Sequence, residues 1–192
     1  MYSKDIYQTL EDRDNPDGIE INGPFKCDRK DAWLGDGYYF WDTFIELAHW
    51  WGHKGYNGNY IICKSNFKYE NDDIFDLVGN TEHIMDFRKI GDYLRKNVYK
   101  PEISVRYIVD YMKTHVRDFR KYKAIRVNGI DSINGDERML ENRYYFNKNN
   151  NAYLDCMPCI QLCVFSKKNI GGDNFKIVYP EMYCEDYTHS FI

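Results

Sequence analysis

Two patterns of hydrophobic and polar residues alternate along this chain. Short stretches with an apolar residue at every second position, rich in β-branched and aromatic side chains, predict strands. These stretches are 5–10, 59–69, 123–127, 159–165 and 175–179. The aromatic triplet Tyr38-Tyr39-Phe40 predicts one more strand.

The middle of the chain follows helical spacing instead. Apolar residues three and four positions apart predict a helix over 81–97, with Ile84, Phe87, Ile90 and Leu94 on one face. After Pro101, Ser104 is expected to begin or cap a second amphipathic helix that reaches about residue 120. Two such helices in succession typically form one layer against a sheet.

The remaining segments are polar. Asn15-Pro16-Asp17-Gly18 has strong turn chemistry, and 18–25 is expected to hold a brief strand or helical turn. A long polar loop, 128–158, is interrupted only by Tyr144-Tyr145-Phe146, and long loops inside compact domains are often functional. We therefore predict one α+β domain over residues 1–192, with a helical segment at about 81–121.

The motif from Leu34 to Trp51 carries the clearest chemistry. Gly35 and Gly37 permit a tight turn and close approach of a ligand to the backbone. The aromatic strand follows, and then Asp42 or Thr43 is expected to cap a helix that ends near 52–55. A turn, a strand and an aromatic-bearing helix can form a slot for a flat heteroaromatic ring.

Composition and charge narrow the class of protein. Of 192 residues, 43% are hydrophobic and 17% aromatic, so the chain can bury a core without metals or disulfides. The net charge of −4, with both signs interspersed, gives no basic stripe for a nucleic acid. No apolar run reaches the length of a membrane helix, so no membrane partner is expected. The six unevenly spaced cysteines suggest reduced thiols and a cytoplasmic location.

Two spacings resemble metal or redox sites. Cys156 and Cys159 could be structural thiols, part of a zinc site or a redox pair, and the strand that follows them favours structural thiols. His49 and His53 lie four residues apart on one predicted helix, without the acidic residue of a zinc protease between them. We expect no metal site.

The order of these features resembles the ADP-ribosyltransferase superfamily, in the branch of poly-ADP-ribose polymerases and small bacterial or phage toxins. The family's glycine-x-glycine strand and aromatic helix are matched by Leu34–Phe40 and Ala48-His49-Trp50. Ile6–Leu10 stands at the place of its first strand, and Cys159–Leu162 at the place of its late strand. The resemblance implies an α+β fold with a split β-sheet core, flanking helices and here a two-helix insertion.

The resemblance also implies a site for NAD+, which would be the substrate. The backbone around Gln8 and Thr9, after Tyr7, would hold the nicotinamide carboxamide, and Gln161 would stand where the family's catalytic Glu bonds the ribose. The ring would stack on Trp50 beside Tyr39, next to the turn that Gly35 and Gly37 shape.

Two departures leave two functions open. Gln8 replaces the family's His, and Gln161 is neutral, so that Glu137 or Glu141 would have to supply a carboxylate. One expectation is a mono-ADP-ribosyltransferase that modifies an unidentified macromolecule, such as a toxin or phage effector with a neutralising partner protein. The other is a catalytically inactive nucleotide-binding or protein-interaction domain on the same fold.

Overall fold

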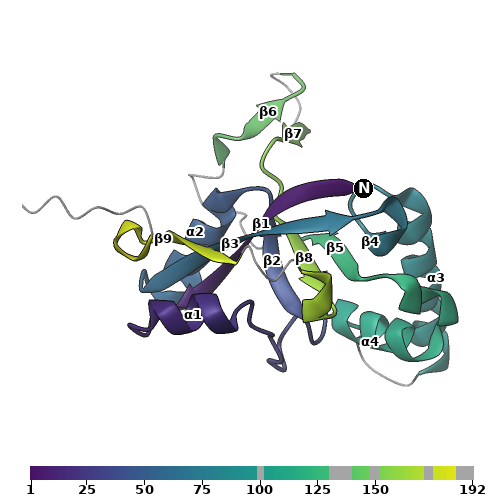
Figure 1. Cartoon of the computed structure of the whole chain (residues 1–192). Coiled ribbons are helices and arrows are strands. Elements are labelled where there is room, and N and C mark those ends of the chain that lie inside the picture. Colours follow the sequence, from purple (N-terminus) through teal and green to yellow (C-terminus); the bar gives the residue numbers. More distant parts are fainter. Residues whose placement is uncertain (99–101, 130–139, 148–151, 171–174, 185–192) are drawn as a thin grey trace, which may run out of the picture.

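A mostly antiparallel sheet of seven strands organises the protein, in the order β4-β5-β8-β2-β1-β3-β9 (Figure 1). The computed structural model describes residues 1–98, 102–129, 140–147, 152–170 and 175–184. The sheet strands are β1 (Tyr2–Glu11), β2 (Tyr38–Asp42), β3 (Tyr60–Tyr69), β4 (Ile74–Asp76), β5 (Ala124–Asn128), β8 (Ile160–Val164) and β9 (Lys176–Tyr179). Only β4 and β5 run parallel among the paired strands of this sheet.

The described helices lie on both faces of this sheet. They are α1 (Pro16–Asn22), α2 (Ile45–Tyr56), α3 (Thr81–Asn97) and α4 (Val105–His115). Strands and helices together make an α+β protein, as the sequence predicts.

The sheet is divided at its centre. β1 pairs with β3 along its whole length, from Tyr2↔Tyr69 to Glu11↔Tyr60. Its register with β2 consists only of Ile6↔Asp42 and Tyr7↔Trp41. Beyond Tyr7 the two strands separate, and the sheet opens between the β1-β3-β9 half and the β2-β8-β5-β4 half.

Alternate side chains of the strands enter different cores, as strand geometry requires. Phe40 and Leu162 join the core under α1 that also contains Ile19. On the opposite face, Trp41 packs with residues of α2, while Cys163 packs with residues of α3 and α4. The α2 layer and the α3–α4 layer therefore cover different halves of the same face, on either side of the opening.

Most predicted elements are confirmed. The helix expected over 81–97 is α3, and its cap is Asn80, whose side chain accepts from the backbone N–H groups of Glu82 and His83. The second helix begins after Ser104 but ends at His115, and a 3₁₀ helix, Arg117–Lys121, continues the chain. The pair forms the expected helical layer.

Two local predictions were wrong. The turn expected at 15–18 is the first turn of α1, where Pro16 is tolerated because the first N–H groups of a helix have no internal partner. Neither Asp42 nor Thr43 caps α2, whose N-cap is Phe44. The Asp42 carboxylate is 2% exposed and accepts from Arg126 Nε at 2.6 Å and Lys4 Nζ at 2.9 Å, so it serves a buried ion-pair network instead.

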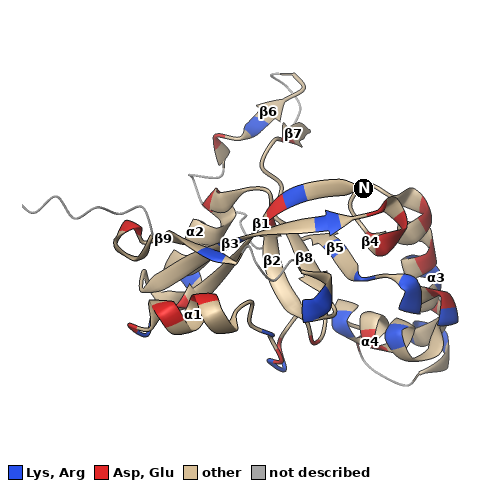
Figure 2. Cartoon of the chain, viewed as in Figure 1, with Lys and Arg blue, Asp and Glu red and all other residues tan. Residues whose placement is uncertain are grey.

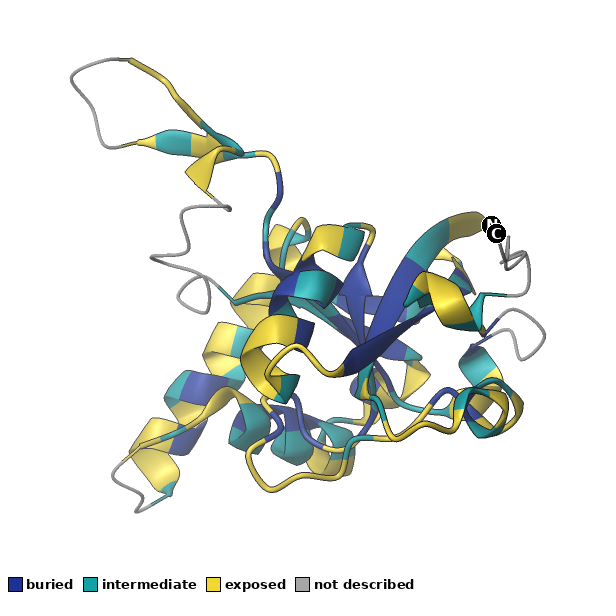
Figure 3. Cartoon of the chain, turned by 90° about the vertical axis from the view of Figure 1, so that its left-hand side faces the viewer, coloured by how far each residue is buried: buried dark blue, intermediate teal, exposed yellow. Residues whose placement is uncertain are grey.

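Part of the long loop carries structure that the sequence did not predict. β6 (Arg143–Tyr145) and β7 (Tyr153–Asp155) form a hairpin that projects from the body of the protein, with Tyr144 and Tyr145 exposed (Figures 1 and 3). The short strand β4 was also not predicted. Pro101 and Glu137 lie outside the described residues. None of the described helices is both long and apolar enough to cross a membrane.

Candidate functional site

A cleft of about 300 Å³ opens where β1 and β2 separate. Its floor comes from β1, β2 and β8, one wall comes from α2, and the loop 25–33 closes the other side. The lining residues are Gln8, Thr9, Leu10, Phe25, Lys26, Cys27, Asp28, Arg29, Asp31, Ala32, Trp33, Tyr39, Trp41, Trp50, Trp51, Tyr56 and Gln161. A volume of this size suits a small ligand or the ring-bearing end of a larger one.

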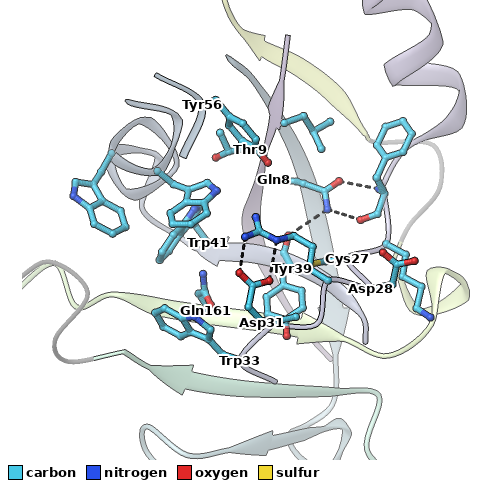
Figure 4. A pocket seen from close by; sticks show the side chains of 17 residues that line it. Gln8, Thr9, Cys27, Asp28, Asp31, Trp33, Tyr39, Trp41, Tyr56 and Gln161 are labelled. Atoms are coloured by element: carbon cyan, nitrogen blue, oxygen red, sulfur yellow. Dashed lines mark hydrogen bonds and ion pairs between the residues drawn. The ribbon is translucent and has the colours of Figure 1, made fainter. Parts of the chain in front are cut away.

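Tryptophans from three elements shape the interior (Figure 4). Trp50 of α2 packs edge to face against Trp41 of β2, with ring centroids 5.9 Å apart and an interplanar angle of 85°. The Nζ atom of Lys54 lies 4.9 Å from the centre of the Trp50 ring. Trp33, on the loop, is 45% exposed. An open aromatic face on a polar loop has little use in the core and is suited to stacking on a ligand.

Gln161 presents a free amide on the cleft floor. Register with Trp41 on one side and Val127 on the other places it near the start of β8, and its side chain lies between Trp33 and Trp41 (Figure 4). Within the described residues, no hydrogen bond to this half-buried amide is found. It can therefore both donate to and accept from a ligand.

The side-chain amide of Gln8, in contrast, is fully hydrogen-bonded within the protein. It is 5% exposed, its Nε2 donates to Phe25 O at 2.8 Å and to Tyr39 O at 3.3 Å, and its Oε1 accepts from Phe25 N–H at 2.8 Å. The amide fills the gap between β1 and β2 and fastens the start of the loop 25–33. Gln8 thus positions the wall of the cleft and has its polar atoms already engaged.

Thr9 offers backbone groups rather than its side chain. Its hydroxyl donates to Ala48 O at 2.9 Å and ties β1 to α2. Asp5 O accepts from Thr43 N on the β2 side, and backbone polar groups alternate sides along a strand. The N–H and C=O of Thr9 therefore point toward β2, beyond the last Tyr7↔Trp41 pair and into the split.

The loop 25–33 is held at several points. Cys27 N–H donates to Gly37 O at 2.8 Å, and Gly37 N–H donates to Cys27 O at 3.1 Å. Arg106 of α4 donates from Nη1 to Arg29 O at 2.7 Å. These contacts connect the cleft wall to the glycine turn and to the helical layer.

Arg29 and Asp31 form an exposed ion pair in the cleft wall. Arg29 Nη2 and Asp31 Oδ2 are 2.6 Å apart, and Nε and Oδ1 are 3.0 Å apart. The hydrogen bonds from Arg29 hold the pKa of the Asp31 carboxyl below its usual value, and Asp31 raises the pKa of Arg29. Since exposed pairs contribute little net free energy, Arg29 can exchange this carboxylate for another anion at small cost.

The glycine turn lies behind the cleft, and its glycines serve packing. Gly35 has a φ of +77°, and a Cβ there would stand 2.6 Å from Asp110 Oδ1. A Cβ at Gly37 would stand 2.3 Å from Cys163 Sγ. Tyr39 closes the turn from the front, because its hydroxyl donates to Gly35 O at 2.7 Å and accepts from Leu34 N–H at 2.8 Å.

The structure brings most of the sequence-predicted site residues together. Those that line the cleft are Gln8, Thr9, Tyr39, Trp50 and Gln161. Those outside the lining are Tyr7, whose ring is buried against α2, Gly35 and Gly37 in the turn, and Glu141, exposed before the hairpin.

The sequence reading missed Trp41 and the loop 25–33. Trp41 could have been found, because it lies two residues after Tyr39 on the same face of a strand. Nothing in the sequence of the loop showed that it folds over the cleft.

The cysteines and histidines with metal-like spacing lie outside the lining of the cleft. No disulfide joins the described cysteines, and Cys159 is buried whereas Cys156 is exposed. In the described part of the chain, no group of three or more His, Cys, Asp or Glu could hold a metal ion. His49 and His53 share the Tyr60 hydroxyl, at 2.8 Å and 3.3 Å, and fasten α2 to β3.

A scan against protein-family models and searches of curated proteins and of solved structures found no match to this chain.

Proposed function

We propose that the cleft binds NAD+ through its nicotinamide end and that the protein transfers ADP-ribose to a macromolecule. The observation that carries the proposal is the meeting of Gln8, Trp50 and Gln161 around one cleft, although they lie far apart in the sequence. They come from the segments on which the resemblance to ADP-ribosyltransferases rests. The division of the sheet between β1 and β2 also fits the split sheet that this resemblance implies.

Nicotinamide has two features that the cleft complements. Its flat ring fits against the tryptophan surfaces, with Trp33 as the most open face. Its carboxamide needs a donor and an acceptor close together, and the Thr9 N–H and C=O, which point into the split, would supply both. The Gln161 amide then faces the attached ribose, whose hydroxyls both donate and accept.

The diphosphate would extend along the loop 25–33. Arg29 and Lys26 line this side, and a guanidinium binds phosphate oxygens in the same two-pronged way in which Arg29 now holds Asp31. Exchange of Asp31 for the diphosphate would fix the dinucleotide across the mouth of the cleft.

The reaction breaks the bond between the nicotinamide nitrogen and the ribose C1 carbon. The bonding electrons leave with nicotinamide, which becomes neutral, and positive charge develops on the ribose. A nucleophile of the acceptor then bonds to C1 and gives up its proton to solvent or a base. Gln161 cannot supply an anion, so the Asp31 carboxylate, released from Arg29, is our candidate to stabilise this charge.

Binding without turnover is the second candidate function. Its support is that Gln161 is neutral and that the Gln8 amide is engaged in structural hydrogen bonds. On this alternative the same cleft would recognise a nucleotide or display it to a partner protein.

Incubation of the purified protein with NAD+ separates these possibilities. We expect nicotinamide release that falls at least tenfold in Gln161→Ala, together with saturable NAD+ binding by calorimetry. Binding with no release would favour the second candidate. Absence of both would contradict NAD+ as the ligand.

A further inference from the structure

A second cavity lies behind the glycine turn, on the side away from the tryptophan cleft. Its volume is about 670 Å³, and it is bounded by α4, the 3₁₀ helix that follows it and the end of β8. Lys26, Asp36, Arg106, Asp110, Lys113, Phe119, Arg120, Tyr122, Phe165, Ser166 and Asn169 line it. We call it the rear cavity.

Three cations from separate positions converge on one residue of the turn, Asp36. Lys26 Nζ lies 3.3 Å from Asp36 Oδ2, and Arg106 Nη2 lies 3.3 Å from Asp36 Oδ1. Lys113 Nζ donates to the backbone O of Asp36 at 3.3 Å. The Asp36 carboxylate thus pairs with both Lys26 and Arg106, whereas Lys113 contacts only the backbone carbonyl of Asp36.

Among these three cations, Lys113 has the fewest negatively charged partners in the described residues. Its Nζ lies 4.3 Å from the centre of the Phe165 ring, and no carboxylate within 4.0 Å pairs with it in the described residues. Burial lowers the pKa of this ammonium, because a partly buried charge loses contact with water. An anion in the cavity would restore the lost stabilisation.

The charge balance of the residues that line the rear cavity also favours an anion as its ligand. Lys26, Arg106, Lys113 and Arg120 face two carboxylates, Asp36 and Asp110, so positive charge is in excess. Arg106 also contacts Asp110, at 3.5 Å. Among the described residues, no carboxylate pairs with Lys113 or with Arg120, whose Nη2 donates to Thr114 O at 3.0 Å. Figure 2 shows basic residues on α4, one of the elements that border the cavity.

We propose that the rear cavity is a binding site for a phosphate group. Lys113 and Arg120 would donate to the phosphate oxygens, and Lys26 would approach from the turn. Ser166 and Asn169 add uncharged hydrogen-bonding groups at the rim. The aromatic rings of Phe165 and Tyr122 lower the local dielectric, which strengthens charge-assisted hydrogen bonds to the anion.

This site is largely separate from the proposed NAD+ site. The two cavities share Lys26 but no other lining residue. Because Lys113 and Arg120 line only the rear cavity, variants at these two positions test phosphate binding separately from NAD+ binding.

Titration with inorganic phosphate, against sodium chloride of equal ionic strength, tests the proposal. Followed by ¹H–¹⁵N NMR, we expect saturable shifts centred on Asp36 and Lys113. Lys113→Gln should weaken binding about tenfold or more, as loss of a charge-assisted hydrogen bond does, and Lys113→Arg should retain it.

Two further variants distinguish a loss of phosphate binding from a loss of folding in Lys113→Gln. Arg120 is exposed, so Arg120→Gln should fold normally and still weaken phosphate binding. Lys121 also lies over an aromatic ring, that of Tyr122 at 4.9 Å, but outside the cavity lining, so Lys121→Gln is the matched control. Equal effects of phosphate and chloride, or equal affinity of Lys113→Gln, Arg120→Gln and Lys121→Gln, would overturn the proposal.

Discussion

The side-chain amide of Gln8 binds both backbone polar groups of Phe25, donating to its O and accepting from its N–H, each at 2.8 Å. The Gln8 side chain therefore supplies hydrogen bonds where β1 and β2 no longer pair with each other. It joins the two halves of the sheet to the loop that closes the cleft.

Gln8→Ala should destabilise the protein by about 2 kcal/mol, because it removes a buried amide together with its hydrogen bonds to the Phe25 N–H, the Phe25 O and the Tyr39 O. Urea unfolding monitored by circular dichroism measures this change. Gln161→Ala is the matched control: the free energy of unfolding should change by less than about 0.5 kcal/mol, because no described residue bonds to that amide. Equal destabilisation by the two variants would show that the hydrogen bonds of Gln8 do not stabilise the fold.

Elements whose local sequence signals agree with one another could be predicted from the sequence. The α3 helix followed from local information, because its apolar stripe and the Asn80 cap agree. The cap of α2 did not, because the Asp42 carboxylate is bound by Arg126, which lies far away in the sequence.

The site was predictable where it lies on regular strands and helices. The patterns predicted the strands and the helix that carry Gln8, Tyr39, Trp50 and Gln161, and the resemblance to ADP-ribosyltransferases assigned these residues to one site. The wall formed by the loop 25–33 depends on contacts with Gln8, Gly37 and Arg106, which no local pattern encodes.

Trp33→Ala should weaken NAD+ binding about tenfold, a loss of about 1.4 kcal/mol that is typical of one aromatic contact. Its stability should change little, because the ring is 45% exposed. Fluorescence titration and thermal unfolding measure the two quantities. Tyr144→Ala, which removes an exposed ring from the hairpin, is the control and should bind NAD+ normally.

Arg29→Gln should weaken NAD+ binding about tenfold or more and leave nicotinamide binding unchanged, because only the dinucleotide carries the diphosphate. Calorimetry with both ligands tests this. Arg13→Gln provides the control, since Arg13 forms a similar two-bond pair with Glu11 outside the cleft lining. Parallel losses for NAD+ and nicotinamide in Arg29→Gln would mean that Arg29 shapes the cleft and does not bind phosphate.

Stability should fall as the pH is lowered through about 6.5, the pKa of histidine in an unfolded chain. Burial, and then the nearby His53, lower the pKa of His49 in the folded protein, so the unfolded state takes up the proton first. Burial lowers the pKa of His83 as well. His49→Asn should reduce the slope of unfolding free energy between pH 7 and pH 5.5, measured by urea unfolding at each pH. An unchanged slope in His49→Asn would exclude His49 as a source.

A crystal structure of the protein soaked with NAD+ tests the central claim most directly. The account predicts a nicotinamide ring against the tryptophans of the cleft, with its carboxamide within hydrogen-bond distance of the Thr9 backbone and the ribose beside Gln161. Arg29 should have turned from Asp31 to the diphosphate. Density for the dinucleotide at another surface, or an empty cleft at saturating NAD+ with Arg29 still bound to Asp31, would contradict it.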